Sequence, residues 1–102
     1  MKTKTDKPEL HLYAVEFTDT FGGEANYCWV ERFAVYAPNI RKAVTLAKQK
    51  RYHSPLPRHT SSGAYQGDSA RIDINGACVC AFIEYIGDDY RADHHGEIIN
   101  GD

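Results

Sequence analysis

The chain has 102 residues, of which 42% are hydrophobic and 25% charged, and its formal net charge is −2 at pH 7. This length predicts one domain with a modest core, and the charge argues against a polycation that coats nucleic acid without selectivity. No apolar run reaches the roughly 18 residues that a membrane span needs, so we expect no membrane partner. Residues 1–9 are polar, lack the apolar stretch of a secretory signal, and are predicted to form a disordered arm.

Two strands are predicted next, over residues 10–18 and 26–36, because apolar side chains alternate along both segments. The segment between them contains Gly22 and Gly23, which accept the positive φ angles of turns. We therefore expect a β-hairpin whose loop is longer than the two-residue minimum.

The strongest helical signal covers residues 39–51. Pro38 ends the preceding strand and Asn39 is a suitable N-cap. Four apolar residues then recur at the i, i+3, i+4 and i+7 spacing of one helix face, and they are Ile40, Ala43, Val44 and Ala47. This spacing predicts a helix with an apolar seam toward a sheet and a basic outer face.

A second hairpin is indicated by Asn75-Gly76, the residue pair typical of a type I′ turn. Residues 54–68 before it contain many turn formers and are expected to be a long loop. A two-residue turn would pair Ile74 with Ala77. The apolar face of this hairpin should then receive the helix, and the opposite face should see solvent or a partner. Side chains predicted on that opposite face are Arg71, Asp73, Cys78, Cys80, Phe82 and Glu84.

Residues 88–102 are acidic, with little to bury, and are predicted to be a flexible tail. Residues 10–87 should accordingly form a single α+β domain. Its element order is β-β-α-β-β, which predicts a four-stranded antiparallel sheet with one helix packed on one face.

Catalytic and metal sites are not indicated. Cys28, Cys78 and Cys80 with a histidine would suit zinc, but the chain has neither a CxxC nor an HxxxH pair. We therefore interpret the cysteines as small packing residues, with free thiols that favour a cytoplasmic location. No nucleophile elbow or phosphate-binding loop is present, so we predict a protein that is not an enzyme and holds no metal or cofactor.

Charge is distributed unevenly along the chain. Residues 32–71 contain eight basic residues against the single acid Asp68, whereas both ends are acidic. We define the basic ridge as Arg41, Lys42, Lys48, Lys50, Arg51 and Arg58. Basic residues along a helix can follow phosphates, which makes nucleic acid one candidate partner. An acidic tail that folds back over the ridge would also account for the two kinds of charge.

A protein partner is the other candidate. One helix covers one face of a sheet, so apolar residues of the opposite parity are expected at the surface, where they favour a protein partner or self-association as a homodimer. Residues 33–48 also resemble the strand–cap–helix unit of small phage- and prophage-encoded accessory proteins, some anti-CRISPR proteins among them. That resemblance implies a non-enzymatic protein that binds a host factor.

The leading hypothesis is therefore a small cytoplasmic binding protein, encoded by a phage or mobile element, that acts through protein–protein contact. The alternative is a nucleic-acid-binding module that uses the basic helix face and the loop after it.

Overall fold

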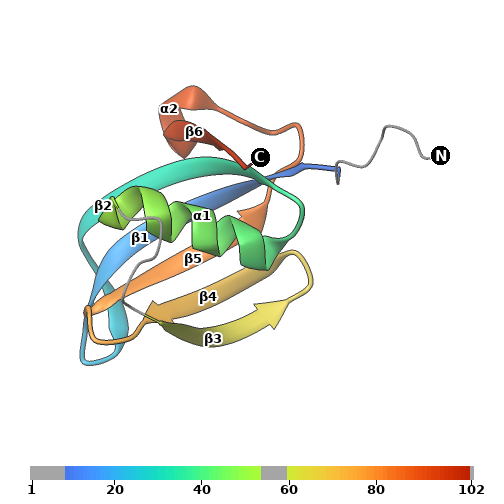
Figure 1. The fold of residues 1–102 in the computed structure, drawn as a ribbon. Coiled ribbons are helices and arrows are strands. Elements are labelled where there is room, and N and C mark those ends of the chain that lie inside the picture. The colour runs from blue at the N-terminus through green and yellow to red at the C-terminus, as the bar shows by residue number, and fades with distance from the viewer. Residues whose placement is uncertain (1–8, 54–59, 102) are drawn as a thin grey trace.

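A computed structural model describes residues 9–53 and 60–101 of the chain (Figure 1). The predicted arm thus lies outside the described residues except for the exposed Glu9. The described elements are β1 (His11–Phe21), β2 (Glu24–Ala37), α1 (Ile40–Tyr52), β3 (Ser61–Gln66), β4 (Ser69–Ile74), β5 (Val79–Tyr85), α2 (Ala92–His95) and β6 (Glu97–Asn100).

The predicted four-stranded antiparallel sheet is wrong. The described strands form one six-stranded sheet in the order β3-β4-β5-β1-β2-β6, and β6 runs parallel to β2 while the other pairs are antiparallel. The two additional strands lie at the two edges. β3 comes from a segment with few apolar side chains and β6 has only four residues, so the hydrophobic pattern did not indicate them.

α1 lies across one face of the sheet (Figure 1). Its residues Ala43, Val44 and Ala47 are buried in the core. The sheet contributes alternate residues of each central strand to the same core, among them Val15, Phe17, Val35, Ile72 and Ile83. The small side chains of the helix seam permit a close approach to the sheet. The predicted seam therefore packs as expected from its spacing.

The first hairpin has a shorter connection than expected. Phe21 pairs with Glu24, so Gly22 and Gly23 alone form the turn, with φ angles of 63° and 85°. Two successive positive φ angles are the requirement of a type I′ turn, which glycine meets without strain. The strands consequently extend further than the apolar pattern indicated.

The second hairpin has a longer connection than expected. Ile74 pairs with Val79 rather than Ala77, and residues 75–78 form the turn. The pairing therefore differs by two residues from the predicted one. Because side chains in a strand alternate with a period of two, this difference leaves the side chains of β4 and β5 on their predicted faces, whereas Cys78 moves into the turn and Cys80 is buried. Ile72 and Ile83 pack in the core, and Arg71 lies on the other face.

β3 arises from residues that we expected to be a loop. Its sequence is Ser-Ser-Gly-Ala-Tyr-Gln, which has little intrinsic preference for strand. It pairs with β4 along its whole length, from Ser61 opposite Ile74 to Gln66 opposite Ser69. Tertiary pairing thus decides its conformation.

The segment expected to be a flexible acidic tail forms α2 and β6. β6 pairs with residues 33–36 of β2, and Ile99 packs against the core. The backbone at Gly101 approaches β2 so closely that a Cβ there would lie 1.8 Å from the carbonyl oxygen of Tyr36. Among the described residues, no helix is long and apolar enough to cross a membrane.

Candidate protein-binding face

The basic ridge does not form one continuous surface. Arg41 and Lys48 are seven residues apart on α1 and both lie toward β3. The Arg41 guanidinium is 4.0 Å from the ring centre of Tyr65, and the Lys48 Nζ donates a hydrogen bond of 3.2 Å to the Ser61 hydroxyl. Partial burial lowers the pKa of the Lys48 ammonium.

Two further cations of the ridge lie on other sides of α1. The Lys50 Nζ is 2.9 Å from a carboxylate oxygen of Glu97 in β6. Arg51 forms an ion pair with Glu31 of β2, and its guanidinium lies 4.3 Å from the Trp29 ring centre. Arg51 follows Ala47 by four residues, so it continues the apolar seam at its C-terminal end. The predicted basic ridge places Arg51 on the outer face of the helix, whereas its guanidinium lies over the rings of Phe17 and Trp29 at one end of the core.

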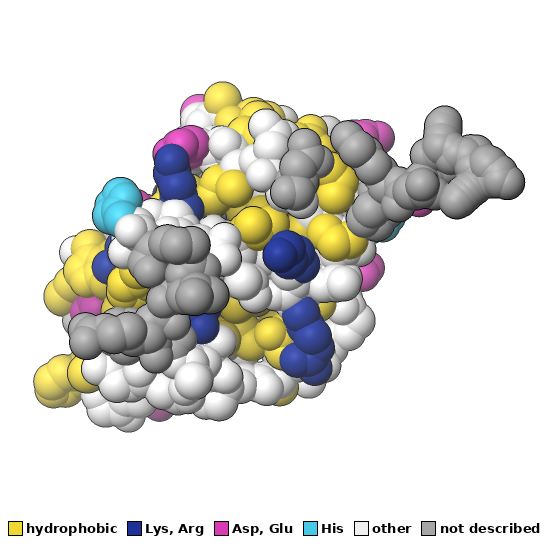
Figure 2. All heavy atoms as spheres, viewed as in Figure 1, with side chains coloured by type: hydrophobic (Ala, Val, Ile, Leu, Met, Phe, Trp, Pro, Cys, Tyr) yellow, Lys and Arg dark blue, Asp and Glu magenta, His cyan; other side chains and the backbone are white. Residues whose placement is uncertain are grey.

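Lys42 is exposed, and its backbone N–H donates to the Asn39 side chain in the expected N-cap. Arg58 lies outside the described residues. Figure 2 shows the Lys and Arg side chains of this side of the molecule in separate groups with apolar surface between them. The ridge is therefore divided among contacts to β3, β6 and β2.

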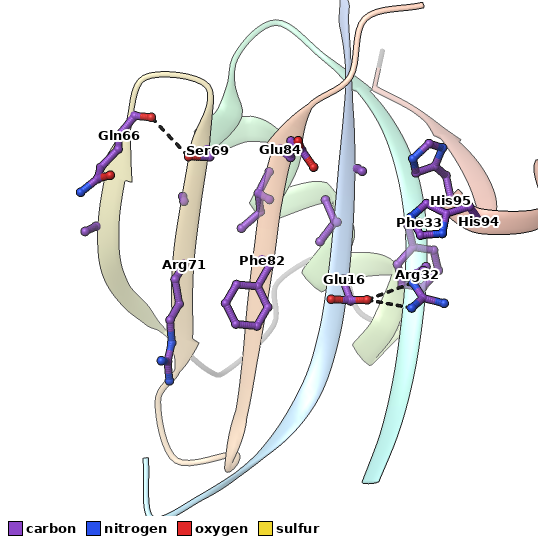
Figure 3. Close-up of a pocket in the computed structure, with 15 residues that line it drawn as sticks. Glu16, Arg32, Phe33, Gln66, Ser69, Arg71, Phe82, Glu84, His94 and His95 are labelled. Atoms are coloured by element: carbon purple, nitrogen blue, oxygen red, sulfur yellow. Dashed lines mark hydrogen bonds and ion pairs between the residues drawn. The ribbon is translucent and has the colours of Figure 1, made fainter. Parts of the chain in front are cut away.

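The sheet face opposite α1 carries a groove of about 500 Å³ (Figure 3). One side of the groove is formed by residues of β3 and β4, the floor by β5 and β1, and the other side by Arg32 of β2 with the two histidines of α2. Figure 3 shows Arg71, Phe82 and Glu16 on this side of the sheet, from three neighbouring strands. This is the face on which we expected a partner.

Both arginines in the groove have acidic partners. Arg32 forms an ion pair of 3.0 Å with Glu16 on the neighbouring strand. Arg71 lies 3.3 Å from Asp73 and donates a bond of 2.6 Å to the carbonyl of Gly23. Glu84 is exposed and makes no ion pair with any described residue. The groove therefore presents one carboxylate that an incoming basic group could neutralise.

Apolar surface continues from the groove toward the turn of the first hairpin. The Phe82 ring stacks on Tyr27, with centroids 6.5 Å apart and ring planes 9° from parallel. Tyr27 remains 54% exposed, and Val30 is 36% exposed. We call Phe82, Tyr27 and Val30 together the aromatic strip, after its two rings. The φ of Tyr27 is positive, 58°, because Tyr27 lies where the β1–β2 register shifts, between the pairs Thr18–Val30 and Thr20–Ala25. No sequence pattern indicated this irregularity.

His95 borders the groove in a buried position. Its Nδ1 accepts a 2.8 Å hydrogen bond from the backbone N–H of Arg91, so the neutral ring carries its proton on Nε2. Burial lowers the pKa of His95, His94 and Arg91 lower it further, and Glu84 and Asp89 oppose the shift. The ring centroids of His94 and His95 are 4.8 Å apart. Both histidines lie within residues 88–102, the predicted flexible tail.

Acidification is expected to destabilise the protein through His95. Its pKa in the folded state lies below the ordinary value of 6.5, so the unfolded chain binds a proton that the folded chain excludes as the pH falls through that value. The free energy of unfolding should decrease until the pH drops below the folded pKa. Urea denaturation at several values between about pH 7.5 and about pH 5 measures this slope.

His95→Gln should flatten the pH slope, whereas His94→Gln should leave most of it, because His94 is exposed. An unchanged slope in His95→Gln would assign the acid sensitivity to other groups.

The cysteines do not gather into a metal site. Cys28 and Cys78 are exposed and Cys80 is buried, where burial raises its thiol pKa. Cys78 lies in the turn after Gly76 rather than on the strand face with Cys80. Within residues 9–53 and 60–101, no three metal-ligating side chains lie close enough together to hold an ion.

Comparisons of the chain with protein-family models, with curated proteins and with solved structures found no match.

Proposed function

We propose that this chain is a small, non-enzymatic binding protein that holds a protein partner on the sheet face opposite α1. The observation that carries the proposal is the groove on that face, in which an exposed aromatic strip adjoins the carboxylate of Glu84. Apolar and aromatic anchors surrounded by polar groups are the usual anatomy of a protein interface. The free thiols of Cys28 and Cys78 support a reducing, cytoplasmic location.

The chemistry of the groove favours a polypeptide with two features. An apolar side chain would cover the stacked rings of Tyr27 and Phe82, since exposed aromatic surface gains most from leaving water. A lysine or arginine would pair with the exposed carboxylate of Glu84, which makes no ion pair with any described residue. We further propose that the chain is encoded by a phage or mobile element and that its partner is a host protein.

Nucleic acid is the less favoured partner. The five described cations of the basic ridge lie on different sides of α1, and Lys50 and Arg51 are already paired with carboxylates, so the five form no continuous track for phosphates. Binding to nucleic acid would weaken steeply with salt and would depend on Lys48, Lys50 and Arg51. Binding through the aromatic strip would depend little on salt.

Site-specific photo-crosslinking tests the proposal. A benzophenone amino acid replaces Tyr27 in one variant and Lys42 in a control, and both are expressed in cells of the chain's source. We expect one protein to be captured from position 27 and not from position 42. The purified captured protein should then bind wild type at least about tenfold more tightly than it binds Phe82→Ala or Glu84→Arg.

Lys42→Glu is the matched control in the binding assay and should retain wild-type affinity. Capture from position 42 alone, capture from neither position, or equal affinity for all variants would refute the proposed face. Capture of a second copy of the chain would replace the foreign partner by self-association.

A further inference from the structure

The outer edge of β3 is an unpaired strand edge among the described elements, because β3 ends the strand order. Its inward hydrogen bonds follow from the pairing. The backbone N–H of Asn75 donates to the carbonyl of Thr60 at 2.9 Å, and alternate residues of an antiparallel pair repeat this arrangement. Ser62, Ala64 and Gln66 therefore bond to β4, and the backbone groups of Ser61, Gly63 and Tyr65 point outward.

This edge lacks the devices that usually protect an edge strand. Natural edges carry lysine, proline, inward charges or bulges, which prevent another strand from pairing. β3 contains none of these residues and pairs with β4 without a register shift. At Gly63 the two strands approach so closely that a Cβ would lie 2.0 Å from the Arg71 carbonyl oxygen. The edge is thus uncharged, and its backbone lies close to β4.

Two cations mark one side of the edge. Tyr65 lies under the Arg41 guanidinium and Ser61 bonds to Lys48, and both β3 residues face α1. They are four residues apart in β3. A strand added to this edge places its own alternate side chains at the same spacing, so two carboxylates four residues apart would meet the two cations.

The charges also decide between candidate occupants. Two copies paired around Gly63 would set Ser61 opposite Tyr65 and bring Lys48 of one copy toward Arg41 of the other, which is repulsive. The chain's own acidic segment lies at the opposite edge, where Glu97 pairs with Lys50. A separate acidic polypeptide meets neither obstacle.

We propose that the outer edge of β3 binds an extended acidic polypeptide segment as a seventh strand, with two carboxylates of that segment four residues apart facing Arg41 and Lys48. Main-chain hydrogen bonds to Ser61, Gly63 and Tyr65 hold the segment, and the two cations select its acidic side chains. The outward backbone groups of β3 and the two cations are not part of the groove, although Ala64 and Gln66 of the same strand line it. The proposal does not depend on the groove having a partner.

A synthetic peptide, acetyl-Thr-Glu-Thr-Val-Thr-Glu-Thr-amide, tests the proposal by titration into the full ¹⁵N-labelled chain. We expect the amide signals of Ser61, Gly63 and Tyr65 to shift most, since their N–H groups gain acceptors. Arg41→Glu combined with Lys48→Glu should weaken binding by at least about tenfold, whereas Lys42→Glu should change it little.

Two control peptides separate the main-chain and charge contributions. Lysine in place of both glutamates should abolish binding, and N-methylation at alternate residues should abolish it without changing charge. No binding of the glutamate peptide, equal binding of the lysine peptide, or shifts confined to Phe82 and Glu84 would overturn the proposal. Phe82→Ala should leave the titration unchanged, so a failure of the groove proposal is distinguishable from a failure of this one.

Discussion

Phe17→Ala is expected to lower the free energy of unfolding by about 3–5 kcal/mol, the usual cost of removing a buried phenylalanine side chain. Phe17 is 0% exposed at the centre of β1. Its ring contacts Phe33 edge-on, with centroids 6.1 Å apart, and the Arg51 guanidinium lies 5.7 Å from its ring centre. The substitution leaves a cavity beneath α1 that the small residues of the helix seam cannot fill.

A domain of this size is stable by only about 5–15 kcal/mol, so the variant should lose a large share of its stability. Urea denaturation followed by the fluorescence of Trp29, which lies beside Arg51, measures the change. The matched control is Phe21→Ala, because Phe21 is 79% exposed at the end of β1. We expect its change to be within about 0.5 kcal/mol. Similar losses in both variants would contradict the assignment of the core.

The sequence predicted the elements whose stability comes from burial. Alternation along β1, β2, β4 and β5 and the apolar spacing in α1 each reflect contact with one core, so the pattern identifies both the element and its buried face. The buried and open faces of β4 and β5 were predicted correctly despite the wrong register, because the register was wrong by an even number of residues. Phe82 and Glu84 were therefore assigned to the open face correctly, although the turn was not.

The elements that the sequence did not predict are held by their neighbours. β3 has few side chains to bury, and β4 supplies its hydrogen bonds. β6 has four residues and pairs in parallel with β2, and the backbone of Gly101 lies close to β2 just after it. Neither property appears in a hydrophobic pattern. Such strands become predictable only after the sheet edge that they join is known.

In the candidate site, too, some positions could be predicted from the sequence and others depend on neighbouring elements. The basic ridge was defined from the charges along the chain. The side chains of Arg51 and Lys48 nevertheless point in different directions, because a helix turns by about 100° per residue. Arg51 stands at the angle of the apolar seam, and this angle could have been read from its spacing to Ala47. The position of His95 beside the groove could not be predicted from the sequence, since it depends on β6 joining β2.

Gly96 offers the sharpest test of how the C-terminal segment is held. It connects α2 to β6 with φ 76° and ψ −151°, a conformation that side-chain-bearing residues rarely adopt. A Cβ at this position would lie 2.2 Å from the carbonyl oxygen of Arg32 in β2. Gly96→Ala should therefore combine backbone strain with a steric clash and lower the free energy of unfolding by about 2–5 kcal/mol.

Gly23→Ala separates the two causes. Gly23 also has a positive φ, 85°, but a Cβ there would meet nothing within 4 Å. The free energy of unfolding of Gly23→Ala should fall only by the cost of backbone strain, about 1–2 kcal/mol. Hydrogen exchange shows where the additional loss of stability in Gly96→Ala arises. Gly96→Ala should lose amide protection in β6, whereas Gly23→Ala should keep it.

The Gly96→Ala variant also links the edge of the sheet to the groove. If β6 leaves β2, the backbone around Arg91 is released, and His95 regains water and loses its acceptor role toward that N–H. Its pKa should then rise toward the ordinary value, and the acid destabilisation should weaken, as measured by histidine titration in NMR. Equal losses of stability in the two glycine variants, with β6 protected in both, would show that the close contact with Arg32 does not hold the C-terminal segment in place.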